Sequence, residues 1–506
     1  MSPILASIAA VLLAYLLHSW LKRPSVKHVK GPPSPSFWLG HERLLRNQEN
    51  FGDLERKWCK DYGSVYRIGG CLGQDVLVVS DPKALDHILH ISHPYPKSQD
   101  FIFILSLILG RGIIVVDGET HHRQRKILNP AFSPAQLKES QVIIRQCSDK
   151  LVNVLTGSLT GDINETVNVL GWTSKVALDI IGLASFRYDF GSLEGHNTEV
   201  GQALRELFTH SQNNTTTFEF MLIALIRLLP NSALKLLRLI STRETRQFAH
   251  LGEVSRRAAR KIMVSQYEVE EQGKDKAIVD LLARARLTGK MDEEEIESQL
   301  VTLIVAGHET TGTTVAWLLY ELSVHPEHQS IIREELKQLK DYDTMPFMNA
   351  AIKEVLRLHP IVHSLTRTAP HDDVLPLSGG KTLAVPKGQT FICTTYAYNR
   401  LPSVWGDDAE EWNPARFLKK DLSVSLGVYA NLMSFGAGPR ACIGWRFAIM
   451  ELQTITARLI QNFEFSLPEG GIELQQFPGS PAVVPVVKGK VHLGAQVPLR
   501  VKVLHQ

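Results

Sequence analysis

A single cysteine near the C-terminal end of the chain stands in a setting suited to metal chemistry. The stretch FGAGPRACIG places Cys442 between Gly438 and Gly444, two residues after Arg440, and an apolar helix-like segment follows. Glycines let a backbone fold closely around a flat ligand. The start of a helix favours an anion and lowers the pKa of a thiol. Because no second cysteine or histidine stands nearby, a Cys442 thiolate suits a metal whose other ligands come from a cofactor, and haem iron is such a case.

Two other interpretations of this stretch were weighed. Gly436 to Ala441 fits the G-x-G-x-x-A dinucleotide fingerprint, but no strand–helix–strand unit surrounds it and no acidic residue stands at a strand end about twenty positions on. A cysteine on a helix is also often inert packing. We expect inert thiols at the other four cysteines, since an odd, sparse set without C-x-x-C predicts neither disulfides nor a zinc ribbon: Cys59, Cys71, Cys147 and Cys393.

A second polar group lies inside an apolar run. AGHETT, Ala306 to Thr311, is flanked by VTLIV and VAWLL, so a solvated helix face is disfavoured. Threonine and glycine weaken a helix, and a hydroxyl or a water can open a local bulge in the backbone ladder. Glu309 and Thr310 would then offer an acid and an alcohol side by side, the groups that proton delivery requires within hydrogen-bond reach.

The pattern F-x-x-G-x-R-x-C-x-G resembles the haem-binding signature of the cytochrome P-450 family. Its fixed positions are filled by Phe435, Gly438, Arg440, Cys442 and Gly444. The resemblance covers about residues 30–506, and the N-terminal part is similar to microsomal fungal members. It implies haem b as the cofactor, with Cys442 as the axial ligand of the iron.

The resemblance also assigns roles to charged residues. Glu309 and Thr310 would deliver protons to bound dioxygen. Glu354 and Arg357 in KEVLRLHP, with Arg416 in NPARF, would form a buried structural network behind the haem. The pattern E-x-x-R is common by chance, and we interpret Glu253 and Arg256 as an exposed helix pair.

Cationic residues should bind the haem propionates, because arginine pairs with carboxylates in a bidentate manner. The family usually has a tryptophan four residues before Arg125, and this chain has His121 there. Arg367 resembles another propionate ligand, and Arg440 would be a third arginine of this kind. Arg123 and Lys126 are either ordinary surface charges or contacts for a reductase.

The elements that must position these residues are mostly helical. The clearest helix begins near Met291, after which acidic residues crowd its first turn, and it ends at Pro326. The fold class we predict is mainly α with small β-sheets (α+β), the cytochrome P-450 fold. We further expect a strand pair over Val65–Asp81, a helix from Pro82, helices within 136–190 and 240–286, and short strands after about Gly470.

The composition favours one large unit after a membrane anchor. The chain has 506 residues, 44% hydrophobic, and a net charge of +3, which gives no reason to expect nucleic-acid binding. Pro3 to Leu21 is nearly continuously apolar and long enough to cross a bilayer. Lys22 and Arg23 follow it, which favours a retained anchor with a cytosolic domain over a cleaved signal peptide. We predict an anchor over 1–23, a proline-rich linker over 24–36 and a haem domain over 37–506.

The predicted function is a monooxygenase in the endoplasmic reticulum membrane. The resemblance implies insertion of one oxygen atom from O2 into an apolar small molecule, with electrons from NADPH through cytochrome P-450 reductase. A haem-thiolate isomerase or dehydratase and a non-catalytic haem-binding membrane protein are the alternatives. A terpenoid or another secondary metabolite is the expected substrate, with fatty acids and aromatic xenobiotics as the alternatives. The expected pocket segments are Phe101–Gly110, Ile361–Leu365 and Phe477–Val484.

Two further expectations concern the membrane. The apolar segment Phe218–Pro230 carries Glu219 and Arg227 roughly on one helical face, which leaves the opposite face, with Leu222 and Leu225, for lipid or for the core. Sequons would be glycosylated only if the domain entered the lumen; they lie at Asn164, Asn213 and Asn214.

Overall fold

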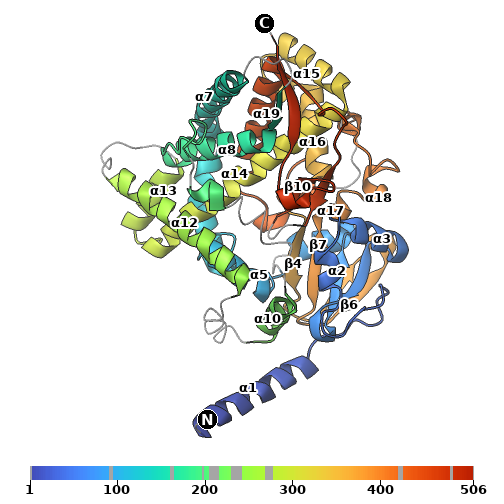
Figure 1. Cartoon of the computed structure of the whole chain (residues 1–506). Coiled ribbons are helices and arrows are strands. Elements are labelled where there is room, and N and C mark those ends of the chain that lie inside the picture. The colour runs from blue at the N-terminus through green and yellow to red at the C-terminus, as the bar shows by residue number, and fades with distance from the viewer. Residues whose placement is uncertain are drawn as a thin grey trace.

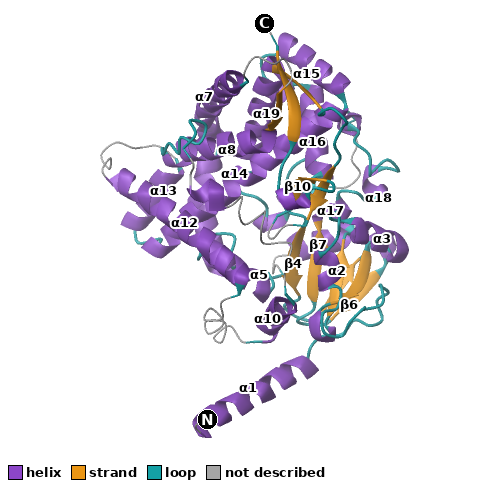
Figure 2. Ribbon diagram, viewed as in Figure 1, coloured by secondary structure: helices purple, strands orange, loops and turns teal. Residues whose placement is uncertain are grey.

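A computed structural model describes residues 3–90, 95–159, 165–196, 199–203, 216–229, 242–267, 277–419, 425–478 and 482–504. Helices fill most of the molecule, and small sheets gather mainly on one side of it (Figures 1 and 2). The predicted class, mainly α with small β-sheets, is confirmed. The three sequons Asn164, Asn213 and Asn214 lie outside the described residues.

The long helix α14, Glu293–Val324, passes through the centre of the helical region (Figure 1). Asp292 caps its N-terminus through the backbone N–H of Glu295, whose side chain bonds back to Asp292. At 32 residues it is about 48 Å long, as its sequence pattern predicts. It packs on α8 (Val169–Phe186), and two glycines on α14 make that approach close. A Cβ on Gly307 would lie 2.9 Å from Ile181, and one on Gly312 would lie 2.7 Å from the Ser174 backbone.

Further helices surround this pair. The predicted helical stretch 136–190 contains α7, then β3, then α8, and the stretch 240–286 contains α12 and α13. The helix predicted from Pro82 is α4. The bounds are α4 Pro82–His90, α5 Gln99–Leu109, α6 Gly118–Leu128, α7 Pro134–Ser158, α12 Arg243–Tyr267, α13 Ile278–Leu287, α15 Pro326–Gln338, α16 Pro346–Leu358 and α19 Trp445–Asn462.

The largest sheet has four strands in the order β1-β2-β7-β4. The predicted strand pair is confirmed as β1 (Val65–Gly69) antiparallel to β2 (Asp75–Val79). Strand β7 (Thr390–Thr394) runs parallel to β2, and β4 (Ser364–Thr368) runs antiparallel to β7. Because side chains alternate along a strand, the register places one row on a single face. That row consists of Tyr66, Val78, Ile392 and Thr366.

Three smaller sheets accompany the four-stranded one among the described residues. The C-terminal tail forms short strands, as predicted: β9 (Leu474–Phe477) pairs with β10 (Val484–Val487), and β11 (Pro498–Val503) lies between β3 (Glu165–Asn168) and β8 (Phe463–Ser466). Strands β5 (Asp373–Pro376) and β6 (Thr382–Val385) form a hairpin. The main apolar core is continuous from Val26 to Val501.

Helix α1, Pro3–Leu21, extends away from the body of the molecule (Figure 1). Its C-terminal turn contacts the domain, because Trp20 Nε1 donates a 3.1 Å hydrogen bond to the Leu72 carbonyl. Among the helices whose side chains the structure describes, the one long and apolar enough to cross a membrane is α8, and 72% of that stretch is buried inside the protein. Helix α8 is therefore a core helix.

The apolar segment at 218–229 forms α10, Thr217–Leu228, and it packs as a core helix. Leu222 and Ile226 are buried against Phe103 of α5. The charged face also meets protein, since Arg227 bonds to Asp100 at 2.7 Å. Of the two alternatives left open for this face, lipid or core, the structure favours the core, because α5 packs against Leu222 and also supplies Asp100 to Arg227.

Candidate active site

The cysteine loop lies between two short 3-10 turns, Met433–Phe435 and Gly438–Arg440, and the start of α19. The Cys442 N–H donates to the Phe435 carbonyl at 2.8 Å and closes the loop. Gly438 has a φ of +67°, and a Cβ there would lie 2.1 Å from the Leu89 carbonyl of α4. The glycine is thus required by close packing against α4, in addition to its backbone conformation.

The Cys442 side chain is exposed by area, yet the surrounding protein desolvates its sulfur. This desolvation raises the pKa of the thiol, and the Gly444 N–H and the Arg125 charge only partly offset it. Burial therefore opposes the lowering of this pKa that a helix start favours. A group that is accessible but poorly solvated faces an enclosed space, where a coordinated metal cation would favour the thiolate.

Cationic side chains from four segments converge beside the cysteine loop. Arg125 on α6 donates to the Ala441 carbonyl at 2.8 Å and so holds the loop directly. Arg440 lies 2.5 Å from Asp117 and also donates to the Val116 carbonyl at 3.1 Å. Burial lowers the pKa of Arg440, and the nearby Asp117 carboxylate opposes that shift.

Two members of this cluster were missed by the sequence analysis, Lys97 and Asp117. Lys97 lies 3.4 Å from Asp117 and donates to the Val116 carbonyl at 3.3 Å. Burial lowers the pKa of Lys97 to about 8. Asp117 immediately precedes the first turn of α6, which was a signal for a helix start, whereas nothing near Lys97 in the sequence marks it as part of a site.

His121 and Arg367 complete the cluster. His121 is 8% exposed, and burial together with Arg440, Lys97 and Arg125 lowers its pKa to about 4, so the imidazole is neutral near pH 7. Arg367 on β4 is buried and donates to the Thr366 carbonyl at 2.8 Å. The cluster therefore holds four cations and one carboxylate, an excess of positive charge that fits a dianionic ligand such as the two haem propionates.

Several residues near the centre of α14 are only half-buried, although the helix on either side of them is buried in protein. They are Val305 to Gly307, Glu309 and Thr310. Thr310 Oγ1 donates to the Ala306 carbonyl at 2.9 Å. The predicted bulge is not present, because α14 is a continuous α-helix from Glu293 to Val324. The Ala306 carbonyl accepts the Thr310 hydroxyl in addition to its backbone hydrogen bond, and the helix remains unbroken.

A buried hydrogen bond connects this turn with the helix that follows the cysteine. Thr311 Oγ1 donates to Glu451 Oε2 at 3.0 Å, which joins α14 to α19. Glu451 is 1% exposed, and burial raises the pKa of its carboxyl well above the usual value. Glu451 was not predicted as a site residue, although a lone acid in the apolar stretch AIMELQTI was a usable signal.

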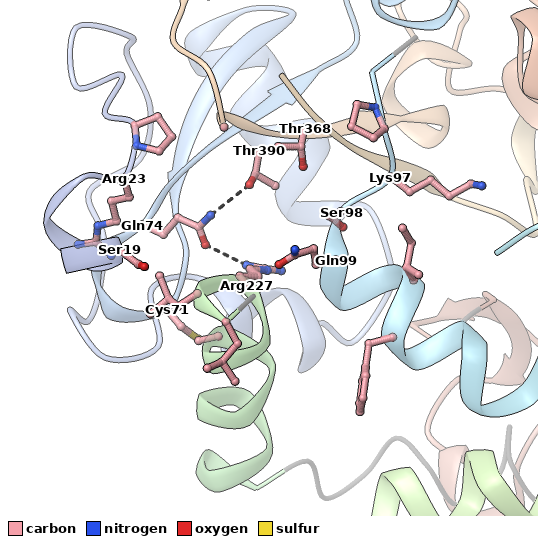
Figure 3. Close-up of a pocket in the computed structure, with 18 of the residues that line it drawn as sticks. Ser19, Arg23, Cys71, Gln74, Lys97, Ser98, Gln99, Arg227, Thr368 and Thr390 are labelled. Carbon is pink, nitrogen blue, oxygen red and sulfur yellow. Dashed lines mark hydrogen bonds between the residues drawn. The ribbon is translucent and has the colours of Figure 1, made fainter. Parts of the chain in front are cut away.

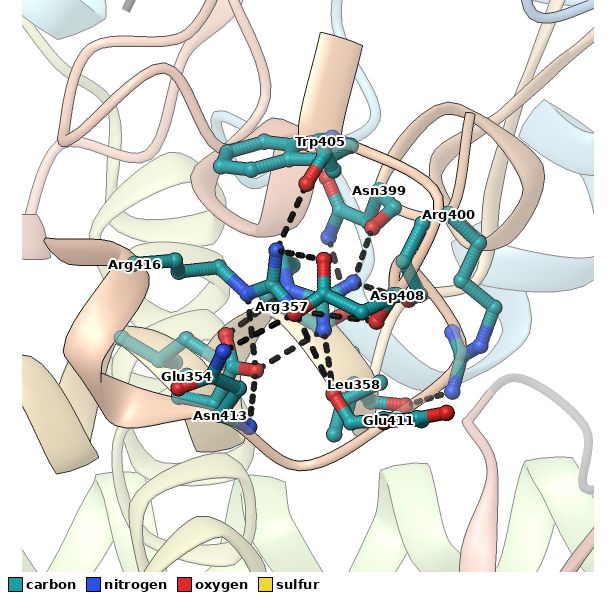
Figure 4. Close-up of polar contacts among 12 residues, drawn as sticks. Glu354, Arg357, Leu358, Asn399, Arg400, Trp405, Asp408, Glu411, Asn413 and Arg416 are labelled. Carbon is teal, nitrogen blue, oxygen red and sulfur yellow. Dashed lines mark hydrogen bonds and ion pairs between the residues drawn. The ribbon is translucent and has the colours of Figure 1, made fainter. Parts of the chain in front are cut away.

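Glu354 and Arg357 on α16 form a fully buried bidentate ion pair, with distances of 2.8 and 2.9 Å (Figure 4). Arg416 adds a second cation 3.0 Å from Glu354. The Asn413 N–H donates to the same carboxylate oxygen at 2.8 Å, and Arg357 donates to the carbonyls of Asn399 and Glu411. The charges are therefore compensated, as buried ions require.

This network reaches the cysteine loop through Asn399. The Asn399 side chain accepts a hydrogen bond from the Met433 N–H at 3.1 Å and donates to Ser434 Oγ at 2.9 Å. Ser434 precedes Phe435, whose carbonyl bonds to the Cys442 N–H. The Glu354–Arg357 pair thus supports the loop indirectly, through Asn399, and has a structural role.

The other charged pairs lie elsewhere. Glu253 and Arg256 form a partly exposed ion pair at 3.3 Å on α12, as predicted. Arg123 is engaged with Glu295 at 2.6 Å and with the Lys290 carbonyl. Of the two cations considered for a reductase contact, Lys126 remains exposed on α6.

Two cavities lie beside this site, over the four-stranded sheet. The larger, about 1030 Å³, lies between α1, α5, α10 and the sheet (Figure 3). It borders the cationic cluster through Lys97 and Asp117 and does not centre on the Cys442 sulfur. The smaller is about 290 Å³. Each expected pocket segment contributes to their walls, for example Phe103, Ser364 and Pro478; residues 479–481 of the third lie outside the described residues.

Comparison with known proteins defines the class of protein. Residues 30–493 match the model of the family described as Cytochrome P450. The chain therefore belongs to the cytochrome P450 family. It is 31% identical to cytochrome P450 monooxygenase 205 of Postia placenta, with 99% of this chain and 97% of the relative covered. It is also 31% identical to cytochrome P450 monooxygenase claW of Ampulloclitocybe clavipes, with 95% and 93% covered.

The protein is accordingly a cytochrome P450 monooxygenase, similar to fungal members over nearly its whole length. Membership of this family implies a haem-thiolate cofactor and, in general, a reductase as partner.

Proposed function

We propose that this protein inserts one oxygen atom from O2 into a C–H or C=C bond of an apolar small molecule, with haem b held by Cys442. The observation that carries the proposal is the accessible but desolvated Cys442 sulfur beside a cluster of four cations and one carboxylate. When bound, haem supplies the activation of dioxygen, which a thiolate ligand favours. The residues of the chain bind the haem, orient the substrate and deliver protons.

The propionate side is formed by residues of α6, β4 and the cysteine loop. Arg125, Arg367 and Arg440 would pair with the carboxylates, and Lys97 adds a cation. His121, neutral near pH 7, can still donate one hydrogen bond where the family usually has tryptophan. Phe435, Gly438 and Gly444 shape the loop.

Proton delivery is assigned to Glu309 and Thr310. Thr310 Oγ1 donates its one hydrogen to the Ala306 carbonyl at rest, so it would rotate away from that carbonyl to pass the proton on, and the Glu309 carboxyl on the preceding residue would replace the proton. Glu309 lies 3.8 Å from His308 and is partly open to the enclosed space. Helix α14 fixes the positions of both residues.

The cellular setting is proposed from α1 and its basic flank. Residues 1–23 are a retained anchor in the endoplasmic reticulum membrane, residues 24–36 a stiff linker, and residues 37–506 a cytosolic haem domain. Electrons come from NADPH through cytochrome P-450 reductase, which docks near exposed Lys126. The substrate is an apolar molecule such as a terpenoid or another secondary metabolite.

Turnover with isotope-labelled dioxygen tests this proposal. The full-length protein, reconstituted with the reductase and NADPH in vesicles, is incubated with a panel of terpenoids, and the products are analysed by mass spectrometry. We expect one labelled oxygen atom in the product and none without NADPH. Product formation that proceeds without NADPH and without label would instead identify an isomerase or dehydratase.

A further inference from the structure

The smaller cavity lies over one face of the four-stranded sheet, and we call it the sheet-face cavity. Its floor is formed by Tyr66 and Ile68 of β1, Val76 of β2 and Ile392 of β7. Trp58 of α3 (Asp53–Tyr62) covers it from one side, and α5 and α10 cover it from others. Its volume of about 290 Å³ is close to the size at which small-molecule sites begin.

Four unpartnered polar atoms in the described part of the chain belong to residues that line this apolar cavity. Among the described residues, Glu55 Oε2 and the Tyr66 hydroxyl are buried without a hydrogen-bond partner, and both residues line it. Glu55 is 9% exposed and Tyr66 is fully buried. Arg46 Nε and Asp100 Oδ1, on two other lining residues, also have no partner. Folded proteins rarely leave such groups unpaired, so each requires an explanation.

The chemistry of the first two groups is complementary. A tyrosine hydroxyl donates readily, and a carboxylate oxygen accepts. Burial raises the pKa of Glu55 to about 7, with hydrogen bonds to its carboxyl only partly offsetting this, so the group is about half ionised at neutral pH. One ligand hydroxyl can accept from Tyr66 and donate to Glu55. A water molecule could make the same two bonds but would not fill the apolar part of the cavity.

Strand β4 separates this cavity from the cysteine loop. Ser364 and Thr366 line the cavity. Leu365, between them, points to the other face, where its Cδ1 lies 3.9 Å from the position of a Cβ on Gly436. Arg367 of the cationic cluster shares that other face by alternation. A molecule in the sheet-face cavity is therefore held beside the reacting site and not at it.

The sheet-face cavity adjoins the larger cavity through a polar partition. Gln74 accepts from Arg227 of α10 at 3.2 Å and donates to Thr390 of β7 at 3.1 Å (Figure 3). Arg227 and Thr390 line both cavities. A ligand in the smaller cavity therefore has a neighbouring space that extends to the cationic cluster.

We propose that the sheet-face cavity binds an apolar molecule that carries one hydroxyl, held between Tyr66 and Glu55. We identify this molecule as the substrate before oxygenation, and this identification rests on the proposed function. An earlier reaction that installs a hydroxyl on the apolar skeleton must then supply it.

Binding of two matched probes tests the site without chemistry. Borneol and bornane share one ring system and differ by a hydroxyl. Equilibrium dialysis against the haem-loaded full-length protein, without NADPH, gives both affinities. We expect borneol to bind at least about tenfold more tightly, because bornane leaves Tyr66 and Glu55 unpaired. Equal binding of the two probes, or binding of neither, overturns the proposal and leaves an ordered water as the occupant.

Two variants test whether the preference for borneol over bornane arises in the sheet-face cavity. Tyr66→Phe should reduce the preference for borneol to about twofold or less, while the unfolding midpoint stays unchanged or rises, because the lost hydroxyl has no partner in the free protein. Tyr62→Phe is the matched control, since Tyr62 packs against the same small core cluster on α3 and does not line the cavity. A preference that survives Tyr66→Phe contradicts the proposal.

The pH dependence gives a second readout for Glu55. Borneol affinity should rise as pH increases through about 7, since the carboxylate accepts the ligand hydroxyl better than the acid does. The other charged or titratable residues that line this cavity are Glu42, Arg46, Tyr66, Cys71, Asp100, Arg227 and His363, and the Asp53 charge also raises the pKa of Glu55. Glu55→Gln should flatten this profile, and Glu49→Gln, on the exposed surface, should not. A profile unchanged in Glu55→Gln overturns the assignment.

The two proposals fail in distinguishable ways. A protein that shows the thiolate spectrum but no borneol preference contradicts the cavity site alone. A protein that prefers borneol but lacks the thiolate spectrum contradicts the monooxygenase mechanism and the identification of the ligand as substrate, and it leaves the binding site itself established.

Discussion

Thr311 Oγ1 donates a 3.0 Å hydrogen bond to Glu451 Oε2, so the helix that carries Glu309 and Thr310 is tied to the helix that follows Cys442. This buried contact joins the helices that carry the two halves of the reaction site, proton delivery and sulfur ligation. The acceptor is a carboxyl whose pKa burial raises well above its usual value.

Glu451 should make the protein less stable as pH rises. The folded state holds this proton more tightly than the unfolded state, so the free energy of unfolding falls with increasing pH from about 4.5 up to the folded pKa. One group contributes at most about 1.4 kcal/mol per pH unit. Urea unfolding of the haem-loaded protein between about pH 5 and pH 8 should show a shallower decline for Glu451→Gln. Parallel curves for the two proteins would remove Glu451 from this role.

Thr310→Ala should uncouple oxygen consumption from product formation. Loss of the Oγ1 proton donor leaves NADPH and dioxygen consumption but diverts reduced oxygen to peroxide, and product per NADPH should fall by about tenfold or more. Thr314→Ala is the control, because Thr314 makes the same type of hydrogen bond, to the Thr310 carbonyl at 2.8 Å, one turn further along. Unchanged coupling in Thr310→Ala would exclude it from proton delivery.

Glu354→Gln should destabilise the protein strongly. It leaves Arg357 and Arg416 buried without their carboxylate, which costs about 3–5 kcal/mol. The cysteine loop should loosen as well, so haem content should fall. Glu253→Gln, in the exposed pair on α12, should change the unfolding free energy by at most about 1 kcal/mol. A buried-pair variant as stable as this control would contradict the network described above.

Lys97 should make haem retention sensitive to alkaline pH. An ammonium group attracts the propionates, and burial lowers the pKa of Lys97 to about 8 before the propionate charges oppose that shift, so haem should dissociate faster at the alkaline pH that deprotonates Lys97. Haem transfer to excess apomyoglobin measures the rate. Lys97→Met should release haem about tenfold faster at neutral pH and lose the dependence. Lys126→Met, on the exposed side of α6, should behave as the wild type.

The sequence predicted those parts of the molecule that local patterns determine. The strand pair at Val65–Asp81, the extent of α14 and the short C-terminal strands follow from alternation, helix capping and turn residues. Glu354 and Arg357 could be distinguished from the decoy on α12 only by the residues around them, and the structure shows the first pair buried and the second partly exposed.

The errors and omissions have a common cause, which is that they depend on contacts between distant segments. The choice between lipid and core for Leu222 depends on α5, which covers it. The sequence predicts that Gly307 weakens the helix, and the structure shows that it also allows α8 to approach. Lys97 enters the cationic cluster only because its backbone passes Asp117 in the folded chain. The thiol pKa of Cys442 depends on burial that no local pattern reports.

Ligation of the haem iron by Cys442 is the central claim, and the spectrum of the reduced carbon monoxide complex tests it most directly. The wild-type protein should show the red-shifted Soret band of a thiolate ligand. Cys442→Ala and Cys442→His should lose that band and all oxygenation, whereas Cys59→Ser, at a half-buried free cysteine, should keep both. A normal thiolate band in Cys442→Ala would contradict the account.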